Sequence, residues 1–234
     1  MRVAVVVFPG TNCEHDVVHA LKLVGREPKL VFHRETDLAG FDAVVLPGGF
    51  AHGDYLRTGA IARFSPVMGP VAEMAAAGMP VVGICNGFQI LCEAGLLPGA
   101  MVANRDLAFI CKPVHLRVEQ TRSSLTAGVE SGTVLRIPLN SYEGNYVADP
   151  ATIDQLEADG QVLLRYCDEA GTVSEAANPN GSSRSIAGIA NAAGNVAGLM
   201  PHPERAVEDI LGGTDGIPLL EAMAVFAPQQ AVHL

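Results

Sequence analysis

The sequence predicts an α/β protein: a three-layer αβα sandwich around a mostly parallel sheet with an added antiparallel region, forming a single domain over residues 1–234. In the first half of the chain, short apolar runs alternate with segments whose apolar residues recur at helical spacing. This alternation is typical of βα units and a parallel sheet. After Pro98 the expected strands are shorter, and apolar and polar residues alternate within them. Gly, Asn, Ser and Asp residues separate these strands, and the pattern favours antiparallel pairing.

The elements follow from these patterns in chain order. We expect strands at 2–8, 28–33, 41–46, 79–84, 113–119, 133–139, 161–167, 185–191 and 196–200. We expect helices at 13–24, 59–78, 86–94 and 217–226. Pro66 and Pro70 should bend or break the second helix. The last two strands read as a hairpin that leads into the segment 201–205, and neither a repeat nor a linker marks a second domain.

Composition narrows the class of protein. Of the 234 residues, 49% are apolar and 17% are charged, which is enough to build a core and excludes intrinsic disorder. The formal net charge of −10 predicts a surface that repels nucleic acid and anionic membranes. No apolar run reaches the roughly 18 residues of a membrane helix, and Met1 leads straight into a strand, so we expect a soluble, cytoplasmic protein. No phosphate-loop or dinucleotide motif supports nucleotide binding.

The cysteines give the first chemical indication. Their odd number and the lack of CxxC spacing argue against a disulfide framework and a structural zinc site, and at least one thiol must stay free. The five are Cys13, Cys85, Cys92, Cys111 and Cys167.

Cys85 lies where an apolar strand ends and a helix begins, between Gly83 and Gly87. This is the pattern of a nucleophile elbow with cysteine in the serine position. The turn should expose the thiol, the helix N-terminus favours the thiolate, and the amide of Asn86 points where an oxyanion would form. The alternative is a buried cysteine that packs as a small hydrophobic residue at a strand end, and the local pattern leaves both open.

A thiolate hydrolase needs a base, and His202 is the histidine with an unusual setting. Pro203 should hold it extended, so Glu204, two residues on, can lie beside the imidazole and fix its tautomer. A proline-stiffened surface loop is the alternative. The Gly-Gly turn after the strand at 41–46 offers Gly49 and Phe50 as a second oxyanion donor, although an ordinary turn explains the two glycines equally well.

Together these residues resemble the class I glutamine amidotransferases, which use a Cys, His, Glu triad on a flavodoxin-like αβα fold. Within that class, six segments in order resemble the glutaminase subunits of phosphoribosylformylglycinamidine synthases: FPGTNCEHD, GGFAHGDYLRTGAIARFSPVM, ICNGFQIL, EGNY, NPNGSSRSIAGIAN and GNVAGLMPHPER. The resemblance spans essentially the whole chain. It implies that Cys85 is the nucleophile, His202 the general base and acid, and Glu204 its orienting carboxylate. It further implies an oxyanion hole from the amides of Gly49 or Phe50 and of Asn86, and a glutamine contact through Gln89.

The resemblance also implies the reaction and the partners. Glutamine would be hydrolysed to glutamate and ammonia through a γ-glutamyl thioester. The ammonia would pass to a large synthetase subunit that uses ATP and Mg²⁺ in purine biosynthesis, with a small bridging subunit, while this chain itself holds no cofactor or metal. The alternatives are an amidotransferase that serves another synthetase, a catalytically silent glutamine-binding subunit, and a cysteine hydrolase or protease on a similar fold.

Two segments stand apart from these assignments. Where the related subunits have a histidine ahead of EGNY, this chain has Asn140, Ser141 and Tyr142, which we expect to contact either the glutamine or the partner subunit. Cys13 belongs to the family pattern, but its neighbours Thr11 and Asn12 predict a plain helix cap, so Cys13 is left out of the catalytic set. Tyr55 and Arg57 fit packing or partner docking as well as catalysis.

Overall fold

The structure is a computed structural model that describes residues 1–230, so the last four residues of the predicted domain, including His233, lie outside it. A nine-stranded sheet runs in the order β2-β1-β3-β4-β11-β10-β9-β6-β7, and a two-stranded sheet pairs β5 with β8. The strands are β1 (Arg2–Val7), β2 (Glu27–Phe32), β3 (Ala43–Leu46), β4 (Val81–Ile84), β5 (Ala100–Val102), β6 (Ile110–Val118), β7 (Val134–Ser141), β8 (Asn145–Val147), β9 (Val162–Cys167), β10 (Ile186–Ala190) and β11 (Val196–Leu199).

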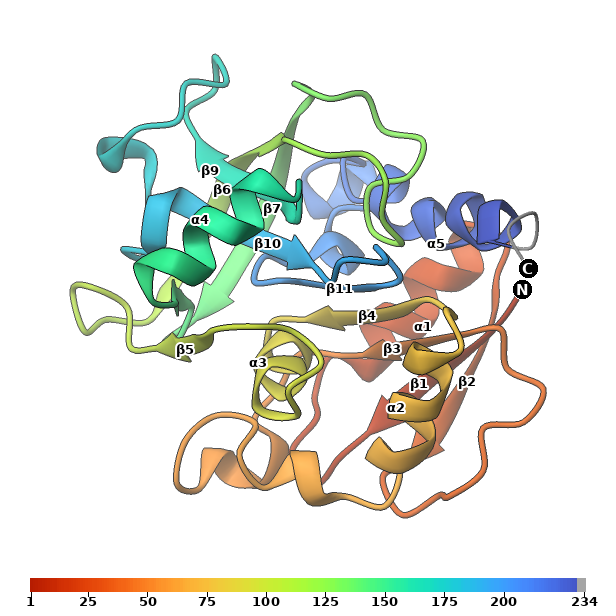
Figure 1. Ribbon diagram of the computed structural model, residues 1–234. Helices are drawn as coiled ribbons and strands as arrows, with labels where there is room; N and C mark the ends of the chain where they lie inside the picture. The colour runs from red at the N-terminus through yellow and green to blue at the C-terminus, as the bar shows by residue number, and fades with distance from the viewer. Residues whose placement is uncertain (231–234) are drawn as a thin grey trace.

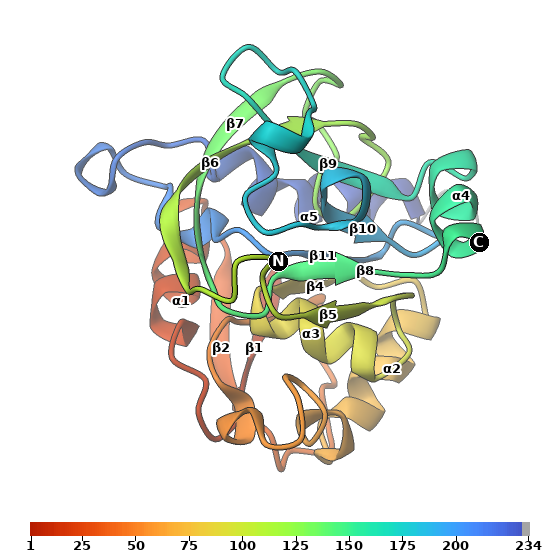
Figure 2. The same ribbon diagram turned by 90° about the vertical axis from the view of Figure 1, so that its left-hand side faces the viewer.

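Helices cover both faces of the sheet. They are α1 (Glu14–Leu23), α2 (Met68–Ala76), α3 (Asn86–Glu93), α4 (Pro150–Ala158) and α5 (Ile217–Gln230). In the side view, β1 and β2 lie between α1 on one side and α2 and α3 on the other (Figure 2). Together with the parallel strand pairs, these layers confirm the predicted αβα sandwich.

The antiparallel region continues the same sheet. β1, β2, β3, β4 and β11 pair in parallel, whereas β10, β9, β6 and β7 pair antiparallel beyond β11. The predicted hairpin at 185–200 is confirmed, with Gly188 opposite Leu199. Figure 1 shows this half of the molecule above the strands that carry α1, α2 and α3. The fold class is therefore as the sequence predicts, with both strand types in one sheet.

The central strands are buried along their whole length, which explains why their apolar sequence predicts them. Every residue of β3, β4 and β11 is buried, so these strands are apolar on both faces, as parallel strands covered by helices must be. β4 and β11 are neighbours, with Ile84 opposite Leu199. Parallel strands end at the same edge of the sheet, so the residues that follow β4 and β11 meet there.

The predicted helix at 59–78 is shorter than expected. Ala62–Phe64 forms one 3₁₀ turn, Ser65 is extended before Pro66, and α2 begins only at Met68. The proline breaks the helix because the residue before it is pushed out of the helical region. Over residues 1–230, no helix is long and apolar enough to cross a membrane.

Candidate active site

Cys85 occupies the sharp turn between β4 and α3. Its backbone has φ 51° and ψ −108°, outside the usual regions for a side chain with a Cβ, and its amide donates to the Leu199 carbonyl at 2.8 Å. Glycine is required at position 87, because a Cβ there would lie 1.9 Å from the Leu46 carbonyl oxygen. This close approach seats the N-terminus of α3 against β3. The elbow predicted from the sequence is therefore present, with its thiol at a helix N-terminus. The prediction that the turn exposes the thiol was wrong, because Cys85 is buried and only 7% exposed.

His202 and Glu204 form a buried pair directly after β11. His202 Nδ1 and Glu204 Oε1 are 2.6 Å apart, and the two residues are only 2% and 1% exposed. The prediction that an extended segment would place Glu204 beside the imidazole was wrong in its geometry. Pro203–Arg205 forms a 3₁₀ turn instead, and this turn brings the carboxylate to Nδ1. Because Nδ1–H donates to Glu204, the tautomer leaves Nε2 free for chemistry.

The electrostatics of this pair favour a charged imidazole. Burial lowers the pKa of His202, but the Glu204 carboxylate and the nearby Cys85 and Cys13 sulfur atoms outweigh it and raise this pKa well above the usual value. His202 Nε2 is buried and has no hydrogen-bond partner among the described residues. An imidazolium that persists at neutral pH can stabilise a neighbouring thiolate and later protonate a leaving amine.

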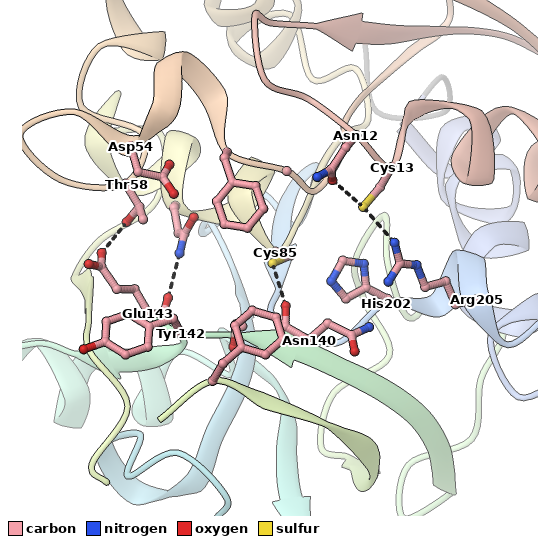
Figure 3. A pocket seen from close by; sticks show the side chains of 15 residues that line it. Asn12, Cys13, Asp54, Thr58, Cys85, Asn140, Tyr142, Glu143, His202 and Arg205 are labelled. Atoms are coloured by element: carbon pink, nitrogen blue, oxygen red, sulfur yellow. Dashed lines mark hydrogen bonds between the residues drawn. The ribbon is translucent and has the colours of Figure 1, made fainter. Parts of the chain in front are cut away.

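These side chains open into one pocket of about 500 Å³, a size suited to a small molecule. Its lining includes Cys85, Gln89, Asn140, His202 and Arg205, together with Asn12, Cys13, Gly49, Phe50, Asp54, Thr58, Phe109, Ser141, Tyr142 and Glu143. In Figure 3, Asp54 and Glu143 lie at one end of the pocket, Cys13, His202 and Arg205 lie at the other, and Cys85 lies between them. The structure thus brings the predicted nucleophile and base into one cavity.

The candidate oxyanion donors are not equivalent. The Phe50 amide donates to the Gly10 carbonyl at 2.8 Å, which leaves Gly49 as the better candidate of the two. Gly49 has φ 152°, and a Cβ at this position would lie 2.7 Å from the Gly10 oxygen. The Asn86 amide is in the first turn of α3, where amides have no intrahelical acceptor. Gly49 and Asn86 are therefore the pair that the geometry favours.

Gln89 lines the pocket, but protein groups already engage its side-chain amide. Its Oε1 accepts from Asn86 Nδ2 at 2.8 Å, and its Nε2 donates to the Glu143 carbonyl at 2.6 Å. Gln89 therefore joins α3 to the segment after β7. A contact with substrate would use the second lone pair of Oε1 or the second N–H of Nε2.

The segment where the family pattern is broken forms one wall of the pocket. The Cys85 thiol donates to the Asn140 carbonyl at 3.6 Å. The Asn140 side-chain amide, oriented to satisfy both of its ends, accepts from Arg205 Nη1 at 3.0 Å and donates to the Leu139 carbonyl at 3.2 Å. Ser141 and Tyr142 line the same pocket. This segment is thus part of the site itself.

Sequence reasoning missed Cys13, which also lines the pocket. The predicted cap was wrong: Cys13 itself precedes α1 without a side-chain cap bond, while Thr11 Oγ1 accepts from the Phe8 amide and Asn12 Oδ1 accepts from the Cys13 thiol at 3.4 Å. Arg205 Nη2 donates to Cys13 Sγ at 3.2 Å. The only available signal was that Cys13 belongs to the family pattern.

The acidic end of the pocket was also missed. Burial, followed by the charge of Glu143, raises the pKa of Asp54 to about 6. Asp54 Oδ1 accepts from Asn86 Nδ2 at 3.5 Å, and Glu143 Oε2 accepts from Thr58 Oγ1 at 3.1 Å. The pocket therefore has a cationic end and an acidic end, one on either side of the thiol.

The chain matches the profile of the CobB/CobQ-like glutamine amidotransferase domain over residues 1–213. Because the match covers most of its length, the chain belongs to this family of glutamine amidotransferases. This confirms the resemblance inferred from the motifs.

Similar proteins narrow the comparison further. The chain is 56% identical over 226 residues to phosphoribosylformylglycinamidine synthase subunit PurQ of Bradyrhizobium diazoefficiens, covering 96% of this chain and 97% of that protein. It is 52% identical over 223 residues to the PurQ subunit of Rubrobacter xylanophilus, covering 95% and 97%. Among solved structures, a chain of PurLQS from Thermotoga maritima superposes with a TM-score of 0.85 at 43% identity, covering 95% and 97%.

Proposed function

We propose that this chain is the glutaminase subunit of a phosphoribosylformylglycinamidine synthase, which hydrolyses glutamine and passes the ammonia to a synthetase subunit. The observation that carries the proposal is the shared pocket of Cys85 and the buried His202–Glu204 pair. Near full-length identity above 50% to PurQ subunits supports the choice of synthase. The PurLQS assembly supports a large synthetase subunit and a small third subunit as partners. ATP and Mg²⁺ would act in the synthetase.

The chemistry proceeds in two halves. In the resting pair His202 has already taken the proton of the Cys85 thiol, and the thiolate attacks the side-chain carbonyl carbon of glutamine. The amides of Gly49 and Asn86 hold the oxyanion, and His202 returns the proton to the departing ammonia. Water, deprotonated by the same imidazole, then hydrolyses the γ-glutamyl thioester to glutamate and regenerates the thiol. Glu204 stabilises each imidazolium that forms.

The pocket supports glutamine as the substrate. A glutamine whose amide carbon sits at Cys85 carries an ammonium and a carboxylate at its other end. Both groups are attached to the α-carbon, so they lie on the same side of the thiol. Asp54 and Glu143 supply negative charge on one side of the thiol, where it would attract the ammonium. The charge of Asp54 increases as the pH rises through about 6, so ammonium recognition should strengthen over the same range.

Glutamate release by the isolated chain and by the chain mixed with its synthetase subunit tests the proposal. Hydrolysis should rise when the synthetase and its substrates are added, since uncoupled ammonia release wastes glutamine. Cys85→Ala should abolish it, while Cys111→Ala, at an exposed thiol of β6, should leave it unchanged. Equal turnover with and without the synthetase contradicts the coupling, and full activity of Cys85→Ala contradicts the assignment.

A further inference from the structure

We infer that the side chain of Asn86 is the positioning group of the oxyanion hole, an inference that rests on the proposed function. The backbone amide of Asn86 is one of the two favoured oxyanion donors, and Gly49 supplies the other. The Asn86 side chain reaches the loop that carries Gly49, because its Oδ1 accepts from the Ala51 amide at 3.1 Å in a buried hydrogen bond. One residue therefore holds both donors, one through its own backbone and the other through its carboxamide.

The loop after β3 depends on its surroundings for its shape. Three of its non-glycine residues have φ between 54° and 71°: His52, Asp54 and Leu56. Residues with a Cβ rarely adopt this region, and they stay there only where neighbouring contacts fix them. The Phe50 amide ties the loop to the segment after β1 by donating to the Gly10 carbonyl. The Ala51 amide ties it to the first residue of α3, Asn86.

A chain of three hydrogen bonds fixes the orientation of the Asn86 carboxamide. Gln89 Nε2 donates to the Glu143 carbonyl at 2.6 Å, and Gln89 Oε1 accepts from Asn86 Nδ2 at 2.8 Å. Asn86 Oδ1 in turn accepts from the Ala51 amide. Exchanging the oxygen and nitrogen of Asn86 would set two donors against each other at one end and two acceptors at the other. Asn86 and Gln89 are buried, so the chain holds Oδ1 on the loop without help from solvent.

Loss of this carboxamide should act on the transition state more than on bound glutamine. The oxyanion forms only when the thiolate has added to the amide carbon, so a displaced Gly49 amide stabilises the transition state less and leaves substrate binding nearly unchanged. Removal of one whole oxyanion donor costs about 100- to 1000-fold in kcat. The Asn86 backbone amide survives a change of side chain, so the loss should reach at least about tenfold and stay within this limit.

Asn86→Leu keeps the branched shape of the side chain without its hydrogen-bonding atoms. With the synthetase subunit present, kcat should fall about 10- to 1000-fold, whereas KM for glutamine should change less than about threefold. Alkylation of Cys85 by iodoacetamide should stay within about twofold of the wild-type rate, because displacement at a saturated carbon forms no oxyanion.

Asn195→Leu is the matched control. Asn195 is also buried, and its Nδ2 donates to the carbonyls of Ala75 and Met79 at 2.8 and 3.0 Å, but it does not line the pocket. The substitution should destabilise the fold in urea, because it leaves buried carbonyls without a donor. It should change kcat of the folded chain less than about twofold, since the oxyanion donors are untouched.

Hydrogen exchange gives a readout that needs neither activity nor a variant. In the wild type, the Ala51 amide should exchange at least about tenfold more slowly than an exposed amide, because its acceptor is buried. Asn86→Leu should lose this protection but keep that of the Gln89 amide, which donates to the Cys85 carbonyl at 3.1 Å.

Three results would overturn the inference: a fast-exchanging Ala51 amide in the wild type, an unchanged kcat in Asn86→Leu, or alkylation of Cys85 that slows as much as kcat. A wild type that exchanges as expected but does not hydrolyse glutamine would instead contradict the proposed function.

Discussion

Replacement of Glu204 by glutamine tests how far the buried carboxylate supports the base. The substitution keeps the shape of the side chain but removes the charge that lies 2.6 Å from His202 Nδ1. Both groups are buried, so solvent cannot replace the lost interaction with the imidazolium. The pKa of His202, which burial alone would lower, should fall, and the alkaline limb of the pH–rate profile should move to lower pH.

The size of the effect follows from the burial. Removing one partner of a buried, hydrogen-bonded charge pair costs about 3–5 kcal/mol, and each 1.4 kcal/mol is about tenfold in rate, so kcat should fall roughly 100- to 4000-fold. Initial rates of glutamate formation across a range of pH measure both effects. Glu208→Gln is the matched control, because Glu208 pairs with His19 at 2.7 Å on the exposed surface. It should change the rate less than about twofold. Near-normal activity of Glu204→Gln with an unshifted pH profile would refute the role of the pair.

Two further predictions concern stability. Gly87→Ala should lower the free energy of unfolding by about 3 kcal/mol or more, since the added Cβ would meet the Leu46 oxygen. Gly69→Ala in α2 has open space around the added Cβ and should raise the free energy of unfolding by about 0.5 kcal/mol. Urea unfolding measures both variants, and equal effects would contradict the packing. Asp54→Asn should stabilise the fold at pH 7.5. The fold raises the pKa of Asp54 from 3.8 to about 6. The contribution of Asp54 to the free energy of unfolding is therefore present at low pH and is lost as the pH rises to about 6. The advantage of the variant should vanish below about pH 4.

The elements that the sequence predicted are those in which one pattern dominates. β4 is a fully buried apolar run between Pro80 and Cys85, and the elbow at Cys85 follows from its junction with α3. α4 was missed, although Asp149 and Pro150 carry an N-cap signal: Asp149 accepts from the Thr152 amide at 3.1 Å. β5 and β8 have only three residues each, too few to show a period.

The site was predictable where its residues lie in local motifs. Cys85, His202 and Glu204 each belong to such a motif, and only the neighbouring positions of β4 and β11 bring them together. Cys13 and Asp54 could not be assigned in this way. Their roles depend on which loops meet at the sheet edge, which the spacing of residues along the chain does not encode.

Trapping of the covalent intermediate tests the central claim most directly. The chain is incubated with glutamine, quenched in acid, and its intact mass and its peptides are measured. The mechanism predicts one γ-glutamyl group on Cys85 in the wild type, and no adduct in Cys85→Ser. An adduct on another cysteine, or steady glutamine hydrolysis by Cys85→Ala, would contradict it.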